Sequence, residues 1–240
     1  MRFLIIGLPR SGSTYLATLV HSHSDAYCAG EIFNPFAIVG LGWKETEPQK
    51  LVARDESPCT FLREFYEQHE NRAAAVGAKF MIGHHPEILS MIEREKDIKI
   101  IYIHRDNKLA QSASWFKALK TRQWAAIDSS VVNHEVLQAW PRELARQARD
   151  FDFSDYIFQN WLGRLQNEVL DVEYCDMFTE DFESKLCAFL DLTLRDRLTS
   201  SLVKQGQDDI LERFEHKREI ERYFRSIGKS DWLNPEIKLN

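Results

Sequence analysis

The sequence predicts an α/β fold in which a mainly parallel sheet is flanked by helices. Two observations lead to this class. Four short runs are apolar, rich in β-branched residues or Phe, and bounded by turn or charged residues, which is typical of buried strands. Each run is followed by a segment with helical periodicity, and this alternation favours βαβ units with right-handed crossovers.

The predicted elements follow one another from the start of the chain. Strands are expected at Arg2–Gly7, Gly77–Met81, Ile98–Ile103 and Val169–Tyr174. The helices that follow them are expected at 12–23, 86–93, 107–119 and 179–191. Residues 133–165 also have a helical pattern, with breaks expected at Pro141 and around 152–154. Because no repeat or Pro/Gly-rich linker divides the chain, residues 1–240 are predicted to form a single domain.

Composition and charge limit the classes of ligand. Hydrophobic residues make up 44% of the chain and charged residues 28%, which is typical of a folded protein. The formal net charge of -6 argues against nucleic acid or an anionic membrane as a partner. The apolar run before Pro9 is too short for a secretory signal or a membrane span, so we expect a cytoplasmic protein with no integral membrane segment. The cysteines have no C-x-x-C spacing, so free thiols and no metal site are expected.

The loop between the first strand and the first helix is the most informative segment. A strand, a loop of small residues and a helix start bring backbone N–H groups and the positive end of a helix dipole around one point, which suits an anion. The segment matches the triphosphate-binding pattern G-x-x-x-x-G-K-[ST] at Gly7, Gly12 and Thr14, but Ser13 replaces the lysine. Without that ammonium the loop suits a single 5′-phosphate, with Arg10 supplying charge. The alternative is a plain Gly/Ser turn.

A second anion site is predicted after the strand at 98–103. Arg105 falls at the carboxyl end of this strand, where open parallel sheets place their ligands. Ser114 lies inside the following helix and is a second donor. The alternative is structural: Arg105 caps the helix or pairs with Asp106, and Ser114 is merely tolerated there.

Taken together, these segments resemble a known enzyme family. Residues 9–14, the strand that ends in His104 and Arg105, and residues 111–118 are similar to sulfotransferases that use 3′-phosphoadenosine-5′-phosphosulfate (PAPS), most closely the bacterial trehalose 2-sulfotransferase type. The similarity extends to 29–31, 77–81 and 121–124, and more weakly to 202–205. The resemblance implies a three-layer, P-loop-like fold and PAPS as the sulfuryl donor, with 3′-phosphoadenosine 5′-phosphate (PAP) as its product and no metal.

The resemblance also implies roles for individual residues. Arg105 with Ser114 would bind the 3′-phosphate, and Ser112 competes for the serine role because other branches of the superfamily place the serine at a shorter spacing. Lys204 and Gln205 match a loop that closes over the adenine end. The 5′-phosphosulfate would be bound by the first loop, which comprises Pro9, Arg10, Ser11, Gly12, Ser13 and Thr14.

Sulfuryl transfer to a hydroxyl also requires a base near the acceptor. Glu31 is the favoured base; it is expected to follow the first helix and to lie beside the loop. Burial and repulsion from an anionic donor are expected to raise its pKa. In the trehalose type, however, the catalytic glutamate corresponds to Asn34, so His84 and His85 are alternative bases. Lys79 would touch the bridging oxygen of the donor or pair with a carboxylate.

The expected acceptor is the hydroxyl of a small molecule, at family level a sugar or a glycolipid, and family likeness also suggests a homodimer. Two other functions are kept as alternatives. The partial match to the triphosphate pattern is compatible with a P-loop nucleotide kinase or NTPase. The absence of a second glutamate near Glu31 is compatible with a homologue that binds PAPS or PAP without catalysis.

Overall fold

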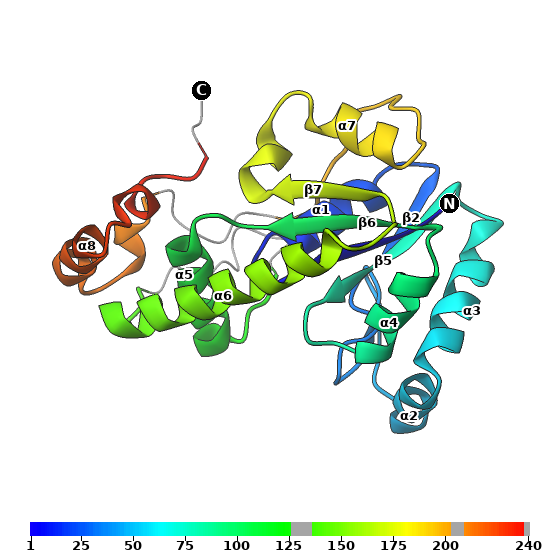
Figure 1. Ribbon diagram of the computed structural model, residues 1–240, viewed down its shortest axis with the longest axis horizontal. Coiled ribbons are helices and arrows are strands. Elements are labelled where there is room, and N and C mark those ends of the chain that lie inside the picture. Colours follow the sequence, from blue (N-terminus) through cyan, green and yellow to red (C-terminus); the bar gives the residue numbers. More distant parts are fainter. Residues whose placement is uncertain (126–135, 203–208, 238–240) are drawn as a thin grey trace. The chain divides into compact units, whose positions relative to one another are not determined.

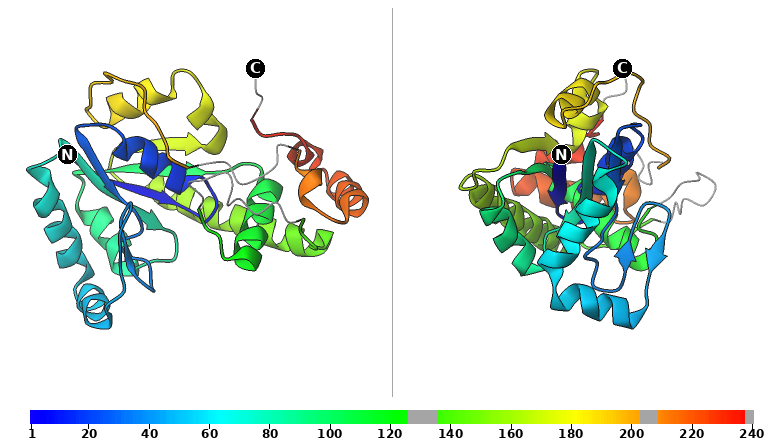
Figure 2. Two further views of the ribbon diagram at one scale, coloured as in Figure 1. Left: turned by 180° about the vertical axis from the view of Figure 1, so that it is seen from behind. Right: turned by 90° about the vertical axis from the view of Figure 1, so that its right-hand side faces the viewer.

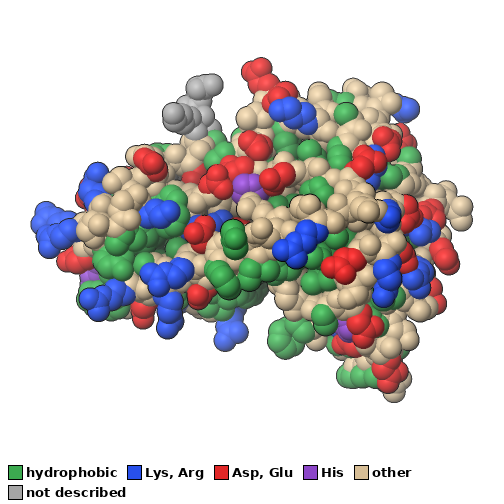
Figure 3. All heavy atoms as spheres, in the orientation of Figure 1, with side chains coloured by type: hydrophobic (Ala, Val, Ile, Leu, Met, Phe, Trp, Pro, Cys, Tyr) green, Lys and Arg blue, Asp and Glu red, His purple; other side chains and the backbone are tan. Residues whose placement is uncertain are grey.

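The structure is a computed structural model that describes residues 1–125, 136–202 and 209–237. The chain forms two compact units. One comprises Met1–His104 with Trp161–Ser200, and the other comprises Arg105–Asn160 with Ser201–Asn240. On the face drawn in Figure 3, acidic and basic side chains are interspersed, as expected for 31 Lys and Arg against 37 Asp and Glu.

The first unit is built on a five-stranded parallel sheet of order β2-β5-β1-β6-β7 (Figure 1). Its strands are β1 (Arg2–Gly7), β2 (Ala26–Ala29), β5 (Ala75–Met81), β6 (Ile98–His104) and β7 (Val169–Glu173). The predicted fold class and the four predicted strands are confirmed. The prediction lacks β2 because Ala-Tyr-Cys-Ala is short and has no β-branched residue. It also extends the last strand to Tyr174, where a 3₁₀-helix, η2 (Tyr174–Phe178), begins instead.

Helices cover both faces of this sheet (Figures 1 and 2). α1 (Ser13–His21) and α7 (Phe182–Phe189) pack on the face that carries Phe3 and Ile5. Because side chains alternate along a strand, Leu4 and Ile6 point to the other face, and both are fully buried. On that side α3 (Pro58–Glu70) packs against β5, and α4 (Pro86–Arg94) packs against α3. The sheet is therefore the middle of three layers.

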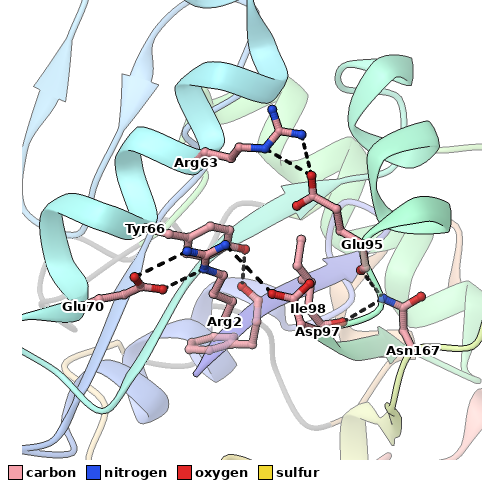
Figure 4. Close-up of polar contacts among 9 residues, drawn as sticks. Arg2, Arg63, Tyr66, Glu70, Glu95, Asp97, Ile98 and Asn167 are labelled. Atoms are coloured by element: carbon pink, nitrogen blue, oxygen red, sulfur yellow. Dashed lines mark hydrogen bonds and ion pairs between the residues drawn. The ribbon is translucent and has the colours of Figure 1, made fainter.

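A polar network ties α3 to the edge of the sheet where the strands begin, which we call the amino edge (Figure 4). The Arg2 guanidinium on β1 donates to Glu70 of α3, with 2.7 Å between Nε and Oε1. The Tyr66 hydroxyl donates to the Phe3 carbonyl at 3.1 Å. The Asn167 amide donates to two backbone carbonyls just before and at the start of β6, both at 2.9 Å. These contacts fix helices and loops to the strands.

The segment after β2 contains elements that the sequence analysis did not assign. A short hairpin of β3 (Ile38–Val39) and β4 (Lys44–Glu45) precedes α2 (Pro48–Glu56). The Arg54 side chain of α2 is only 1% exposed. Its Nη1 donates to three carbonyl oxygens, of Ile32, Asn34 and Ala37, at 3.1, 2.8 and 3.2 Å. This buried guanidinium fastens the loop that follows Glu31.

The second unit is helical, with α5 (Lys108–Thr121), most of α6 (Pro141–Leu162), α8 (Lys217–Ser226) and the 3₁₀-helices η3 (Leu211–Arg213) and η4 (Ser230–Leu233). Its apolar core includes Leu109, Leu144 and Phe224. The predicted break at Pro141 is confirmed as the start of α6, but the break at 152–154 is wrong: the helix continues, and the Ser154 hydroxyl donates to the carbonyl of Asp150 at 2.8 Å. Among the described helices, none combines the length and apolarity needed to cross a membrane.

Candidate functional site

The loop between β1 and α1 has a backbone suited to an anion. Positive φ angles of 65° at Arg10 and 99° at Gly12 flank Ser11, and such alternation makes successive N–H groups converge. α1 begins at Ser13 with no acidic residue in its first turn and, within the described chain, no side-chain cap. The first N–H groups of the helix are therefore left for another acceptor.

Two further features of this loop indicate a ligand. The Ser11 hydroxyl is buried and has no hydrogen-bond partner among the described residues, which is costly unless an acceptor binds there. At Gly12, a Cβ would lie 2.7 Å from Cδ2 of Tyr174 and 2.8 Å from Cε of Met177. Only glycine combines that close approach with a positive φ. The loop is therefore held in one shape by its neighbours.

A charged series connects the loop to Glu31. The Lys79 ammonium donates to Thr14 Oγ1 at 2.7 Å and lies 2.8 Å from Glu31 Oε1. The Lys79 side chain is 7% exposed and that of Glu31 is 25% exposed. The carboxyl ends of β1, β2 and β5 thus bring together the predicted residues Thr14, Glu31 and Lys79 at one edge of the sheet, which we call the carboxyl edge. Of the two alternatives for Lys79, pairing with a carboxylate is what the structure describes.

β2 explains the position of Glu31. Glu31 comes after the first helix in the chain, as predicted, but β2 lies between them and pairs with β5 in a register that aligns Ala29 with Ala78. The Gly30 carbonyl then accepts from the Lys79 N–H at 3.1 Å, so Glu31 emerges beside Lys79. A Cβ on Gly30 would lie 2.8 Å from the Val39 carbonyl oxygen, so the hairpin packs closely over this turn.

The carboxylate of Glu31 is held ionised by its partners. Burial acts to raise its pKa, but the nearby Lys79 ammonium, with which it also forms a hydrogen bond, and the Asn34 amide together lower the pKa below its usual range. Asn34 Nδ2 donates to Oε2 at 2.7 Å. The cation in direct contact thus outweighs the expected effect of burial, while repulsion from an anionic donor stays a prediction.

Of the two histidines, His84 lies nearer the carboxylate, with 3.9 Å between its Nε2 and Glu31 Oε2. Burial lowers the pKa of His84 to about 4, and the opposing attraction of Glu31 does not offset it. Nδ1 accepts from the Met81 N–H at 3.2 Å, so the neutral ring carries its proton on Nε2, facing Glu31. This arrangement makes His84 a donor toward the carboxylate. His85 precedes α4, and its buried Nδ1 has no hydrogen-bond partner within the described chain.

The second predicted anion site lies in the second unit. Arg105 is buried, and its guanidinium forms a bidentate ion pair with Glu236, with 2.6 Å between Nε and Oε1. The Lys108 ammonium donates to the Arg105 carbonyl and to Asp155 of α6. The residue that caps α5 is Asn107, not Arg105: Asn107 Oδ1 accepts from the Ala110 N–H at 3.0 Å. The structure therefore gives Arg105 an ion-pairing partner far along the chain.

The two serines of α5 lie on different sides of the helix. Residues two apart are separated by roughly 200° around a helix, so Ser112 and Ser114 cannot share one face. Ser112 is fully buried, and its hydroxyl has no hydrogen-bond partner among the described residues, whereas Ser114 is partly exposed. Lys204 and Gln205 lie outside the described residues. No group of three or more His, Cys, Asp or Glu side chains within the described chain is arranged to hold a metal ion.

Comparison with known proteins identifies the family. The model of a family described as "Sulfotransferase family" matches residues 3–196, which is most of the chain. The chain belongs to the sulfotransferase family. The crystal structure of a sulfotransferase from Alicyclobacillus acidocaldarius matches this chain with a TM-score of 0.55, covering 96% of this chain and 98% of that one at 17% identity. At that identity the likeness supports the fold alone.

Curated relatives match over a shorter length. Nodulation protein H of Rhizobium meliloti (strain 1021) is 29% identical over 131 residues, which is 53% of this chain and 51% of that protein. Nodulation protein H of Rhizobium tropici is 25% identical over 125 residues, covering 51% of this chain and 48% of that protein. The chain therefore spans about half the length of the curated relatives it matches.

The structure adds one residue to each of the two predicted sites. Asn34 bonds the carboxylate of Glu31, although the sequence analysis treats it only as the position of a missing glutamate. Glu236, the partner of Arg105, has no local pattern that distinguishes it from the other acidic residues near the end of the chain. Only the tertiary structure identifies such a long-range pair.

Proposed function

We propose that the chain transfers a sulfuryl group from PAPS to the hydroxyl of a small acceptor, a sugar or a glycolipid. The observation that carries the proposal is the series Thr14–Lys79–Glu31, which connects a loop suited to an anion to a partly buried, ionised carboxylate. Family membership supports sulfuryl transfer, and the likeness to the trehalose type favours a carbohydrate acceptor.

The loop residues would hold the 5′-phosphosulfate. Backbone N–H groups from Gly12 to Thr14 and the guanidinium of Arg10 would balance its charge. Because Thr14 Oγ1 accepts from the Lys79 ammonium, its own hydrogen is available to a ligand oxygen, and a charged donor strengthens that hydroxyl as a donor. Ser11 would supply its buried hydroxyl.

Lys79 would stabilise the leaving oxygen of the donor. An ammonium carries three N–H bonds, and among the described residues the acceptors are Thr14 and Glu31, which leaves one N–H for the oxygen that leaves with the phosphate. PAPS supplies the activated sulfuryl group. The bond between the acceptor oxygen and sulfur forms as the bond between sulfur and the bridging phosphate oxygen breaks.

Glu31 would accept the proton of the acceptor hydroxyl. Its lowered pKa keeps it ionised at neutral pH, and a carboxylate bonded to Lys79 and Asn34 still has lone pairs to offer. His84 is less suited to the role, because the nitrogen that faces the site carries the proton in the neutral ring. Arg105, with Ser112 or Ser114, would bind the 3′-phosphate of the donor, and Lys204 and Gln205 would close its adenine end.

Glu31→Gln tests the proposal. It removes the base without changing shape, and we expect kcat for transfer from labelled PAPS to fall by about 10²–10⁴-fold. The Kd for PAP, measured by calorimetry, should stay the same or decrease, because Lys79 loses an anionic partner. The matched control is Glu67→Gln on the exposed face of α3, which should change neither quantity.

The outcomes separate the alternatives. Unchanged transfer by Glu31→Gln would remove Glu31 from the mechanism. PAP binding with no transfer to any sugar, lipid or phenol by the unsubstituted protein would support a non-catalytic homologue. Tighter binding of ATP with magnesium than of PAP would support a nucleotide kinase or NTPase.

A further inference from the structure

The guanidinium of Arg105 already has an anionic partner within its own unit. Arg105 and Glu236 form two parallel hydrogen bonds, and their side chains are only 8% and 5% exposed. A guanidinium offers the same fork of donors to a carboxylate and to a phosphate. Glu236 therefore occupies the donors that an anionic group of a ligand would need.

The Glu236 side chain is buried, but the backbone on its amino-terminal side is exposed and irregular. Residues 234–237 form neither helix nor strand, and Asn234 and Pro235 are exposed. The preceding η4 is fixed to α5, because Asn107 Nδ2 donates to the Trp232 carbonyl at 3.0 Å. Beyond η4, the polar contacts described for this segment include the ion pair with Arg105 and a hydrogen bond from the Asn234 N–H to the Asp231 carbonyl at 3.2 Å. Such a segment can leave without disturbing the apolar core.

We propose that Glu236 competes within the chain for the guanidinium of Arg105, and thereby sets the affinity and selectivity for nucleotides with a 3′-phosphate. The inference rests on the proposed function, since it takes Arg105 as the 3′-phosphate site. A carboxylate and a phosphate repel each other, and Glu236 already takes the Nε and Nη2 donors of the guanidinium, so binding of one anion disfavours binding of the other. The 3′-phosphate must therefore displace Glu236, whereas a nucleotide without this phosphate leaves the ion pair intact.

Calorimetry on two ligands tests the competition. PAP and adenosine 5′-phosphate differ only in the 3′-phosphate, so each protein provides an internal comparison. In Glu236→Gln the Kd for PAP should decrease at least fivefold, within the usual range for coupled binding, while the Kd for adenosine 5′-phosphate stays within twofold. The control is Glu221→Gln, which removes an exposed pair with Arg225 on α8 and should change neither Kd.

Hydrogen exchange on the unsubstituted protein gives a second measurement that does not depend on the variant folding. PAP should speed amide exchange in residues 229–237, because Glu236 is released, and adenosine 5′-phosphate should not. The inference is overturned if folded Glu236→Gln binds PAP no more tightly than the unsubstituted protein, or if PAP slows exchange in this segment. If neither protein distinguishes PAP from adenosine 5′-phosphate, the assignment of the donor itself fails, and the inference with it.

Discussion

The two edges of the sheet in the first unit both carry ion pairs, but in different surroundings. At the amino edge, the side chains of Arg2 and Glu70 are 25% and 35% exposed, so water screens their attraction. At the carboxyl edge, Lys79 is almost fully buried between Thr14 and Glu31. Burying charge is costly even when it is paired, so a buried pair is weak evidence for stability and a better indication of a functional site. The exposed pair at the amino edge therefore contributes little to stability, and the buried cation at the carboxyl edge marks the candidate site.

The largest effect is expected from Lys79→Met. The substitution leaves the Glu31 carboxylate buried without its cation and removes a donor from the leaving oxygen. We expect kcat for transfer to fall by about 10²–10³-fold and the free energy of unfolding to fall by about 3 kcal/mol. Sulfuryl transfer and urea denaturation measure the two effects.

Lys50→Met is the control for Lys79→Met. The Lys50 ammonium pairs with Glu45 and Glu47 at the surface, so its removal should leave both quantities unchanged. Full activity in Lys79→Met would eliminate the functional distinction between the two edges.

A second large effect is expected from Gly12→Ala. The new methyl group meets Tyr174 and Met177 and forces alanine to a positive φ, which together should cost about 2–4 kcal/mol of unfolding free energy. Gly42→Ala separates the two causes: φ at Gly42 is 88°, but no atom lies within 4 Å of the added Cβ. Denaturation of the control should show only the conformational part, about 1–2 kcal/mol. Equal losses in the two variants would mean that close packing does not fix the loop.

The buried His84 should make stability depend on pH. The pKa of His84 is lowered to about 4 in the folded chain, while the unfolded chain takes up the proton near the ordinary value of 6.5. The unfolded state therefore binds more protons between these values, so stability is present above pH 6.5 and decreases as the pH falls. Between pH 7.5 and pH 5, urea denaturation should show a loss about 2 kcal/mol larger in the unsubstituted protein than in His84→Asn. The same loss in both would show that His84 is not responsible.

The smallest effect is expected at the amino edge, from Arg2→Met. Loss of its surface pair with Glu70 should lower the free energy of unfolding by at most about 1 kcal/mol. Transfer activity and the Kd for PAP should not change, because the substitution lies at the opposite edge from Thr14, Glu31 and Lys79. A tenfold loss of transfer would show that the edges are not independent.

The sequence contains enough information for the parts of the fold whose interactions are local. The strand at Arg2–Gly7 has its predicted bounds. Its apolar run lies between Arg2 and Gly7, and these two residues mark its ends. The loop from Pro9 to Thr14 follows from the same order of strand, turn and helix. The break predicted at 152–154, by contrast, is absent. The Ser154 hydroxyl donates to the Asp150 carbonyl one turn earlier, so the serine fits within a continuous helix.

The site depends on contacts that no local pattern contains. The lowered pKa of Glu31 comes from Lys79, and the two meet only because β2 pairs with β5. β2 itself is four residues long, and pairing with β5 fixes it more than its own composition does. The sequence could therefore indicate which residues belong to the carboxyl edge, but not which of them are in contact.

The order of strands has a consequence for refolding. β5 lies between β2 and β1, although both of those strands precede it in the chain. Thr14 and Glu31 therefore cannot be bridged by a local hairpin; they are joined only when the later strand has inserted between the two earlier ones and has brought Lys79 with it. Pairings between distant segments form slowly. Recovery of catalysis after dilution from denaturant should thus lag behind helix formation and report the insertion of this one strand.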